Sequence, residues 1–297
     1  MIPATAAAVK RREQEVHMGK LTLVGTPIGN LGDLSPRALE ALGEADFIAA
    51  EDTRVSLKLL NHFGIKKPLV SYYQHNLRER GQQILDRVRG GENCVIITDA
   101  GMPCISDPGE DLVSLCHDQG VPLTAVPGPT AALTALAVSG LPTGRFAFEG
   151  FLSVKKPSRM ARLEEIKDDP RTLIFYEAPH KLKTTLRDLC QALGEDRPVS
   201  LCRELTKIHE EIWRTTLGEA LARYQEEEPR GEFVLVVGGA PEREKAPPMP
   251  LEEAARLAAQ LAEGGLSLSE AAKRVAQDTG YPKGELYRLA LKGPGTE

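Results

Sequence analysis

The sequence predicts an α/β protein of two domains with a small helical extension at its end. Short apolar strands alternate with helices along the first half of the chain, which is typical of a mainly parallel sheet with helices on both faces. The second half mixes strands and helices, and only helical segments follow a proline- and charge-rich linker. The predicted divisions are a disordered tail at 1–18, two α/β domains at 19–141 and 142–240, and the linker and extension at 241–297.

Composition limits the class of protein. The 297 residues are enough for two domains and a smaller one, and 41% hydrophobic with 27% charged residues is ordinary for a globular protein. A net charge of -5 argues against a surface that binds nucleic acid everywhere, but leaves room for a local basic patch. No apolar run approaches the roughly 20 residues of a membrane span.

Cysteines and histidines do not predict a metal site or disulfides. The five cysteines are odd in number and contain no CxxC pair, which favours free thiols in a reducing cytoplasm. The six histidines have no metal-ligand spacing. We therefore expect a cytoplasmic protein without a metal cofactor.

The first domain is predicted to contain five strands, at 21–24, 47–50, 69–73, 94–97 and 121–126. Ser35 caps the first helix, Pro36 begins it and Gly43 is expected to end it. Asp107 is expected to cap a later helix that begins at Pro108. The other predicted helices occupy 55–62, 78–89 and an alanine-rich stretch that ends at 140.

The second domain begins after a boundary predicted at 141–152. Its predicted strands are 172–176, 199–202, 211–215 and 233–237, and its helices begin near 155 and span 181–193 and 217–226. Only the short link 203–210 joins the second strand to the third, and no crossover helix fits in it. This pair is therefore predicted to be antiparallel.

The extension is predicted to hold three short helices. Ser267 and Glu270 form a capping box, Gly280 ends that helix, and the last two helices resemble a helix-turn-helix pair. From 240 to 297 there are eight basic and nine acidic residues, fewer basic ones than a module that reads DNA usually has. A role in docking onto the rest of the protein, onto a partner or onto an RNA surface is as well supported as direct reading of nucleic acid.

Glycine-rich and polar segments follow the strands of the first domain. They are 25–29, 51–54, 75–76, 99–101 and 127–130. Ligands bind at the carboxyl ends of strands in open α/β sheets. The loop 98–109 holds two glycines, two prolines and two aspartates and exceeds an ordinary connection. The sequence therefore predicts a ligand pocket at this edge, with this loop as its central wall.

The motifs of several enzyme classes are missing. The loop 25–30 matches neither GxGxxG nor a P-loop, and Pro27 removes an N–H that a phosphate cradle would use. No GxSxG motif of a serine hydrolase is present. The first loop suits a cofactor that needs shape and carbonyl acceptors rather than anion donors.

Seven segments, taken in order, resemble the tetrapyrrole methylase superfamily. They are 24–33, 50–54, 98–109, 126–131, 149–152, 175–180 and 202–207. Within the superfamily the chain is similar to the ribosomal RNA small subunit methyltransferase I family, over about 21–237 and in the helical extension. Two residues depart from the family pattern: Ser153 replaces a proline, and Gln74 replaces an acidic or similar residue before His75.

The resemblance implies a class III methyltransferase fold and a homodimer. It also implies S-adenosylmethionine as cofactor, 16S rRNA of the small ribosomal subunit as substrate, and methylation of the 2′-oxygen of a decoding-site cytidine. The implied cofactor pocket lies between the two α/β domains. Its residues are Pro27, Asp99, Ala100, Gly101, Met102, Ser106, Thr130 and Ala131 from the first domain, and Tyr176, Glu177, Arg203 and Glu232 from the second.

Methyl transfer to a ribose oxygen needs in-line placement and is helped by a base. Asp52 and His75 are the candidate bases, with Arg54 orienting a carboxylate or holding a phosphate. The alternative is that Asp52 and Arg54 only pair with each other to fix their loop. In the loop 98–109, Gly101 and Met102 are expected to contact the cofactor, and Asp107 to begin the helix.

A basic cluster is the candidate RNA contact. It consists of Lys155, Lys156, Arg159 and Arg162. The alternative is a solvated helix face, as most charge runs are. Two other functions remain open: methylation of a corrin or porphyrin precursor, which would need a wide apolar trough, and a non-catalytic protein that binds RNA or the ribosome.

Overall fold

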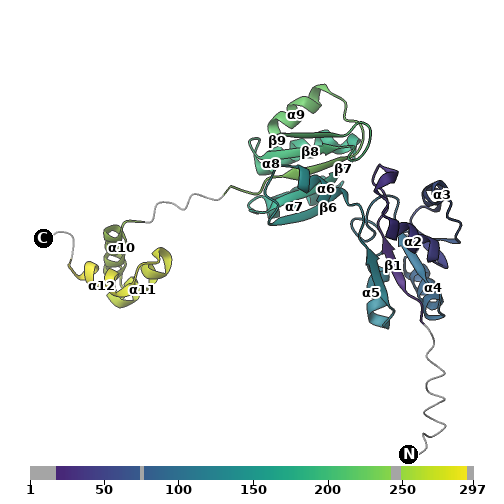
Figure 1. The fold of residues 1–297 in the computed structure, drawn as a ribbon. Coiled ribbons are helices and arrows are strands. Elements are labelled where there is room, and N and C mark those ends of the chain that lie inside the picture. Colours follow the sequence, from purple (N-terminus) through teal and green to yellow (C-terminus); the bar gives the residue numbers. More distant parts are fainter. Residues whose placement is uncertain (1–17, 74–76, 242–248, 293–297) are drawn as a thin grey trace, which may run out of the picture. The chain divides into compact units, whose positions relative to one another are not determined.

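The computed structural model describes residues 18–73, 77–241 and 249–292 (Figure 1). The candidate base His75 and its neighbour Gln74 lie outside the described residues. The chain divides into two compact units, Met1–Ala240 and Pro241–Glu297. Both α/β sheets belong to the first unit.

The first sheet is parallel throughout, as predicted. Its strands β1 (Leu21–Val24), β2 (Phe47–Ala50), β3 (Leu69–Ser71), β4 (Cys94–Ile97) and β5 (Leu123–Val126) run in the order β3-β2-β4-β1-β5. Every residue of β2 and β4 is buried, because one apolar cluster lies on each face of the sheet. The carboxyl ends of all five strands consequently meet at one edge.

Helices supply the other half of each cluster. The helices α2 (Pro36–Glu44) and α3 (Thr53–His62) contribute Leu42 and Leu60 to one face. The helices α4 (Leu77–Arg89) and α5 (Glu110–Gln119) contribute Leu85 and Leu112 to the other. A short 3-10 turn, η1 (Leu31–Asp33), precedes α2.

The helix starts and stops agree only in part with the prediction. Ser35 caps α2 and accepts the Ala38 N–H at 3.2 Å, as expected, but Gly43 lies inside α2. The prediction for α5 is wrong, because the residue before the helix is Gly109, not Asp107. Gly109 has φ +136, in the region that favours glycine. Asp107 therefore stays in the loop.

The second sheet is mixed, in the order β6-β7-β10-β8-β9. Its strands are β6 (Phe146–Phe151), β7 (Thr172–Glu177), β8 (Pro198–Arg203), β9 (Glu211–Thr216) and β10 (Phe233–Val237). The pair β8–β9 is antiparallel, which confirms the prediction from its short link. The edge strand β6 pairs in parallel with β7 and was not expected from the sequence, which predicted only a boundary there.

The two faces of the second sheet are covered by helices of different origin. The helices α7 (Lys156–Ile166), α8 (Pro179–Leu193) and α9 (Leu217–Glu226) bury one face. The other face packs against α6 (Ala131–Val138), which follows β5 of the first sheet. Helix α6 thus carries the chain from one sheet to the other and holds the loop after β5 beside the second sheet.

The C-terminal unit is a small three-helix body (Figure 1). Its helices are α10 (Leu251–Glu263), α11 (Leu268–Thr279) and α12 (Lys283–Lys292), around a core that includes Ala258, Val275 and Leu286. The predicted Ser267–Glu270 capping box is present and Gly280 ends α11 with φ +78. No helix in the described part of the chain is long and apolar enough to cross a membrane.

Candidate active site

A cleft lies between the loops of the first sheet and the strands of the second. It holds about 720 Å³ of empty space, including its opening to solvent. Six of the twelve predicted cofactor residues line it: Ala100, Ser106, Ala131, Tyr176, Glu177 and Glu232. The other lining residues are Ile28, Asp107, Phe151, Cys202, Glu204, Leu205, Lys207, Phe233 and Val234.

Close backbone packing shapes the first wall of the cleft. A Cβ on Gly128 would lie 2.7 Å from the Gly25 Cα, so the loops after β1 and β5 touch through glycine. Thr26 and Gly101 exchange backbone hydrogen bonds of 2.9 and 3.0 Å. Gly101 has φ +90. These contacts bind the three loops that follow β1, β4 and β5 into one surface.

In the part of the chain that the structure describes, non-glycine residues with positive φ lie in two loops beside the cleft. Among the described residues, the non-glycine positions with positive φ are Cys104 (+70), Ser106 (+64), Glu204 (+51) and Thr206 (+66). Such conformations cost of order 1–3 kcal/mol each and cluster at ligand clamps. The loop after β4 and the loop after β8 are therefore held in special shapes on opposite walls.

A network of charged groups fixes the loop after β8. The Lys207 Nζ lies 2.8 Å from both a Glu204 and a Glu232 carboxylate oxygen, and Glu204 also accepts the Glu232 N–H at 2.9 Å. Burial opposes ionisation of Glu204, but these hydrogen bonds outweigh it and lower the pKa of Glu204 below its ordinary value. Both carboxylates thus form ion pairs with Lys207.

Tyr176 joins the second sheet to α6. Its hydroxyl accepts the Ala132 N–H at 3.1 Å and also bonds the Thr130 side chain. Its ring makes edge contacts with Phe148 and Phe151, with centroids 5.0 and 5.5 Å away. Burial raises the pKa of Tyr176, so its hydroxyl keeps its proton and acts as a structural support of the cleft.

Glu177 is internally satisfied. It is 4% exposed, accepts the Ala178 N–H at 2.9 Å and receives a hydrogen bond from the Thr185 hydroxyl. It thereby replaces a side-chain cap at the start of α8, where Ala178 has none to offer. Its contribution to the cleft is therefore a carboxyl group that is already hydrogen-bonded within the fold.

The candidate base Asp52 is occupied by Arg54. Asp52 caps α3 by accepting the Arg54 N–H at 2.8 Å, and it receives two hydrogen bonds from the guanidinium at 3.0 and 2.6 Å. These bonds lower the pKa of Asp52 to about 2. The observed geometry agrees with the alternative interpretation, in which Asp52 and Arg54 pair with each other to fix their loop. Asp52 is also not among the residues that line the cleft.

Three other carboxyl groups gather near the ends of β2 and β4. Asp99 accepts the Asp52 N–H at 3.2 Å. Burial, together with the neighbouring carboxylates, raises the pKa of both Glu51 and Asp99. Asp107 faces the cleft, and burial, followed by the charge of Glu51, raises its pKa to about 6. These groups hold protons more readily than ordinary carboxylates do.

The remaining predicted cofactor residues support the cleft without lining it. Met102 packs its sulfur against Gly25, where a Cβ would lie 2.7 Å away. Thr130 is the N-cap residue of α6, and Arg203 donates to Glu211 at 3.0 Å. The others outside the lining set are Pro27, Asp99 and Gly101.

The basic cluster divides into exposed and internal members. Lys155 and Lys156 are exposed. Arg159 is 7% exposed, pairs with Asp188 at 2.6 Å and donates to the carbonyls of Ser153 and Val154. The prediction that Arg159 contacts RNA is therefore wrong, because its guanidinium is buried and bonded to groups inside the fold.

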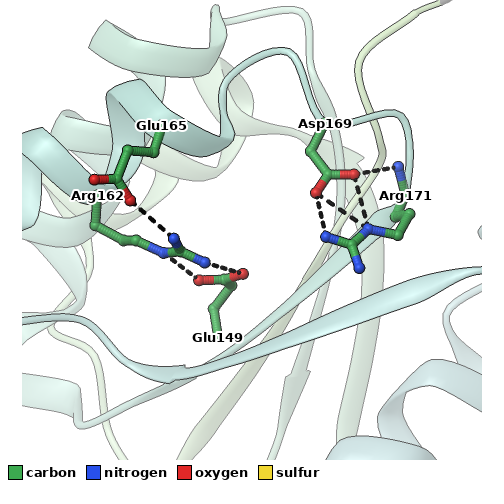
Figure 2. Close-up of polar contacts among 5 residues, drawn as sticks. All are labelled: Glu149, Arg162, Glu165, Asp169 and Arg171. Carbon is green, nitrogen blue, oxygen red and sulfur yellow. Dashed lines mark hydrogen bonds and ion pairs between the residues drawn. The ribbon is translucent and has the colours of Figure 1, made fainter.

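Arg162 is exposed but paired. Figure 2 shows its guanidinium between Glu149, at 2.8 and 3.0 Å, and Glu165, at 2.9 Å, with the separate Asp169–Arg171 pair nearby. The two carboxylates neutralise the charge that a phosphate would need. Lys155 and Lys156 remain as the candidates for RNA contact.

Several cleft residues were missed by sequence reasoning. Glu204 and Lys207 lie in the segment 202–207 that carries the family resemblance, but nothing in their spacing predicts that they meet Glu232. Asp107 was placed in a helix start. Among the described residues, no three His, Cys, Asp or Glu side chains are grouped to hold a metal ion.

Comparison with known proteins shows which families this chain resembles. The profile of the tetrapyrrole (corrin/porphyrin) methylases matches residues 20–221, and that of the RsmI C-terminal HTH domain matches 248–293. A ribosomal RNA small subunit methyltransferase I of Synechocystis is 46% identical over 275 residues, 93% of this chain and 98% of the relative. The protein of the same name from Halalkalibacterium halodurans is 47% identical over 281 residues, 93% and 96% of the two chains.

Solved structures share the fold. A uroporphyrin-III C-methyltransferase from Thermus thermophilus, solved in complex with S-adenyl homocysteine, aligns with a TM-score of 0.52 at 24% identity. The alignment covers 74% of this chain and 97% of that one. The first unit of the chain therefore has the two-sheet fold of these methyltransferases.

Proposed function

Since this chain belongs to the tetrapyrrole methylase family, and within it to the ribosomal RNA small subunit methyltransferase I family, we propose that it methylates the ribose 2′-oxygen of a decoding-site cytidine in 16S rRNA. Its cofactor is S-adenosylmethionine, as for this family of methyltransferases. The observation that carries the proposal is the identity of 46–47% to relatives named for this RNA, which extends over 93% of the chain and includes the C-terminal unit.

The residues of the cleft fit this cofactor. Apolar side chains, among them Ile28, Leu205 and Val234, offer contact to a flat base and to methylene groups. The carboxylates facing the cleft suit a ligand that carries a sulfonium and an ammonium charge. The one lysine of the lining set, Lys207, is held by two carboxylates, so the cleft is poorly suited to a phosphate.

The chain's own contribution to the reaction is placement. S-adenosylmethionine brings an activated methyl group when bound. The fixed loops after β1, β4 and β5 and the loop after β8 hold the reacting groups from opposite walls, and good alignment alone is worth roughly 7–11 kcal/mol. The rigid contacts Gly25–Gly128 and Tyr176–Ala132 support this role.

Lys155 and Lys156 are proposed to contact the RNA backbone. Both are exposed and lie at the start of α7, in the segment that follows β6 and its cleft residue Phe151. The proposed RNA-binding surface does not include Arg162, which is ion-paired, or Arg159, which is buried. The protein is further proposed to act as a homodimer in the cytoplasm, on the small ribosomal subunit or its rRNA.

Mass-spectrometric mapping of 16S rRNA from cells with and without the protein tests this function. The expected result is loss of one ribose methyl group on a decoding-site cytidine in the cells that lack the protein, and its return with the wild-type gene. Purified protein is then given S-adenosylmethionine with small subunits or with a tetrapyrrole precursor. Methylation of the tetrapyrrole alone contradicts the proposal, and binding of RNA without any methyl transfer favours a non-catalytic protein.

A further inference from the structure

Asp107 lies on the cleft wall, in the strained loop between β4 and α5. We propose that its carboxylate accepts the proton of the ribose 2′-hydroxyl during methyl transfer. This inference rests on the proposed function, since it names the base for that reaction. Asp107 thereby takes the role of base for which Asp52 was a candidate. Asp52 is paired with Arg54 and does not line the cleft.

The other carboxylates of the cleft are already committed. Glu177 is held by the Ala178 N–H and the Thr185 hydroxyl, and Glu204 and Glu232 share Lys207. In contrast, no lysine or arginine in the described part of the chain forms an ion pair with Asp107. The polar neighbour of Asp107 is the Thr98 side chain, which acts to lower the pKa of Asp107. A carboxylate without a cation partner keeps its affinity for a proton.

The surrounding charges increase that affinity. Glu51 from the end of β2 and Asp99 from the end of β4 act on Asp107, while the Cys104 thiol and the Tyr176 hydroxyl are its other titratable neighbours. Burial comes first among the causes that bring the pKa of Asp107 to about 6, with the Thr98 side chain acting against it. A base works best with a pKa near the working pH, whereas the pKa of Asp52 is about 2.

The backbone holds Asp107 in this position. Ser106 before it has φ +64 and Gly109 after it has φ +136. A Cβ on Gly109 would lie 2.6 Å from the Cys104 Sγ, so the turn is tightly packed. Gly109 is the N-cap residue of α5, so Asp107 stays in the loop, where it lines the cleft.

The proposed step is balanced. The 2′-oxygen forms a bond to the methyl carbon as the carbon–sulfur bond breaks, and that electron pair stays on sulfur, which becomes a neutral thioether. The hydroxyl proton moves to Asp107, whose carboxylate becomes neutral. Water takes the proton from Asp107 after product leaves.

Single-turnover methylation of small subunits from cells lacking the protein tests the inference. Asp107→Asn keeps the size of the side chain and one of its oxygens. We expect a rate about 100-fold lower, within the range for loss of a general base. The matched control is Asp118→Asn, an exposed aspartate on α5, which should retain the wild-type rate. Calorimetry should give the same affinity for S-adenosylmethionine in all three proteins.

The pH profile and a direct titration separate a base from a structural residue. The wild-type rate should rise with pH and level off above about 6, and this rise should vanish in Asp107→Asn. Carbon NMR of the labelled aspartate carboxyls in the free protein should show one group titrating near that pH, absent from the spectrum of Asp107→Asn.

Three outcomes overturn the inference: an Asp107→Asn rate within a few-fold of wild type, an unchanged pH profile, or an Asp107 carboxyl that titrates near its ordinary value. Weaker cofactor binding with an unchanged rate at saturation would instead make Asp107 a cofactor contact. If wild-type protein methylates no rRNA, the proposed function fails, and the NMR titration still reports on Asp107.

Discussion

Asp52 and Arg54 form a bidentate ion pair within the first turn of α3, with contacts of 3.0 and 2.6 Å. The same Asp52 carboxylate also caps the helix, through the Arg54 N–H at 2.8 Å. Two residues that look like catalytic groups in the sequence thus satisfy each other. The aspartate that lines the cleft is Asp107, in the loop between β4 and α5.

The Asp52 pair predicts a pH dependence of stability. Hydrogen bonds from Arg54 lower the pKa of Asp52 from 3.8 to about 2. A lowered pKa in the folded state stabilises the fold above the unfolded value, and this contribution disappears as the pH falls through the folded value. Wild type should therefore exceed Asp52→Ala in stability above about pH 4, with the difference vanishing towards about pH 2. Urea unfolding across this range measures it, and a difference that grows on acidification would contradict the assignment.

Removal of Arg159 should destabilise the fold. The side chains of Arg159 and Asp188 are 8% and 4% exposed, so Arg159→Ala leaves a buried carboxylate without its cation. Breaking a buried pair in this way costs about 3–5 kcal/mol, which chemical denaturation would detect. Arg171→Ala breaks the pair with Asp169, in which the arginine is exposed to 43%, and serves as the control, with a much smaller effect. Equal effects would refute a structural role specific to Arg159.

Charge reversal at the start of α7 should weaken RNA binding. We expect Lys155→Glu with Lys156→Glu to lower the affinity for small-subunit rRNA and to reduce the slope of log affinity against log salt by about 0.7 to 0.9 for each lost phosphate contact. Lys20→Glu is the control, because exposed Lys20 precedes β1 at the end of the sheet away from the cleft. A salt slope equal to that of Lys20→Glu would remove this surface from the proposal.

An added methyl group at Gly128 should disturb the cleft. In Gly128→Ala the Cβ would lie 2.7 Å from the Gly25 Cα, so the loops after β1 and β5 must separate. Overpacking of this kind costs about 1–3 kcal/mol, and we expect weaker binding of S-adenosylmethionine by calorimetry. Gly144→Ala, where nothing lies within 4 Å of the new Cβ, is the control. Wild-type affinity in Gly128→Ala would show that this contact does not shape the site.

Local patterns predicted most of the first sheet. Apolar runs such as 94–97 are buried strands, and the helices between them force parallel pairing. The short link after β8 predicted the antiparallel pair β8–β9. The sequence did not predict strand β6, because Glu149 and Gly150 interrupt its apolar pattern. At the same place the β6–β7 register shifts, between Phe148 and Gly150.

The sequence by itself determined nine of the ten strands and most of the helices, because periodicity, caps and turns act between residues close along the chain. The six predicted residues that line the cleft came from the resemblance to a known family. Only the tertiary structure decided which charged side chains are paired with one another inside the protein. Arg159 meets Asp188 across 29 residues, and Lys207 meets Glu232 across 25, through side chains from separate elements. The position of Asp107 depends on Ser106 and Gly109 adopting positive φ, which packing imposes and a one-dimensional pattern does not record.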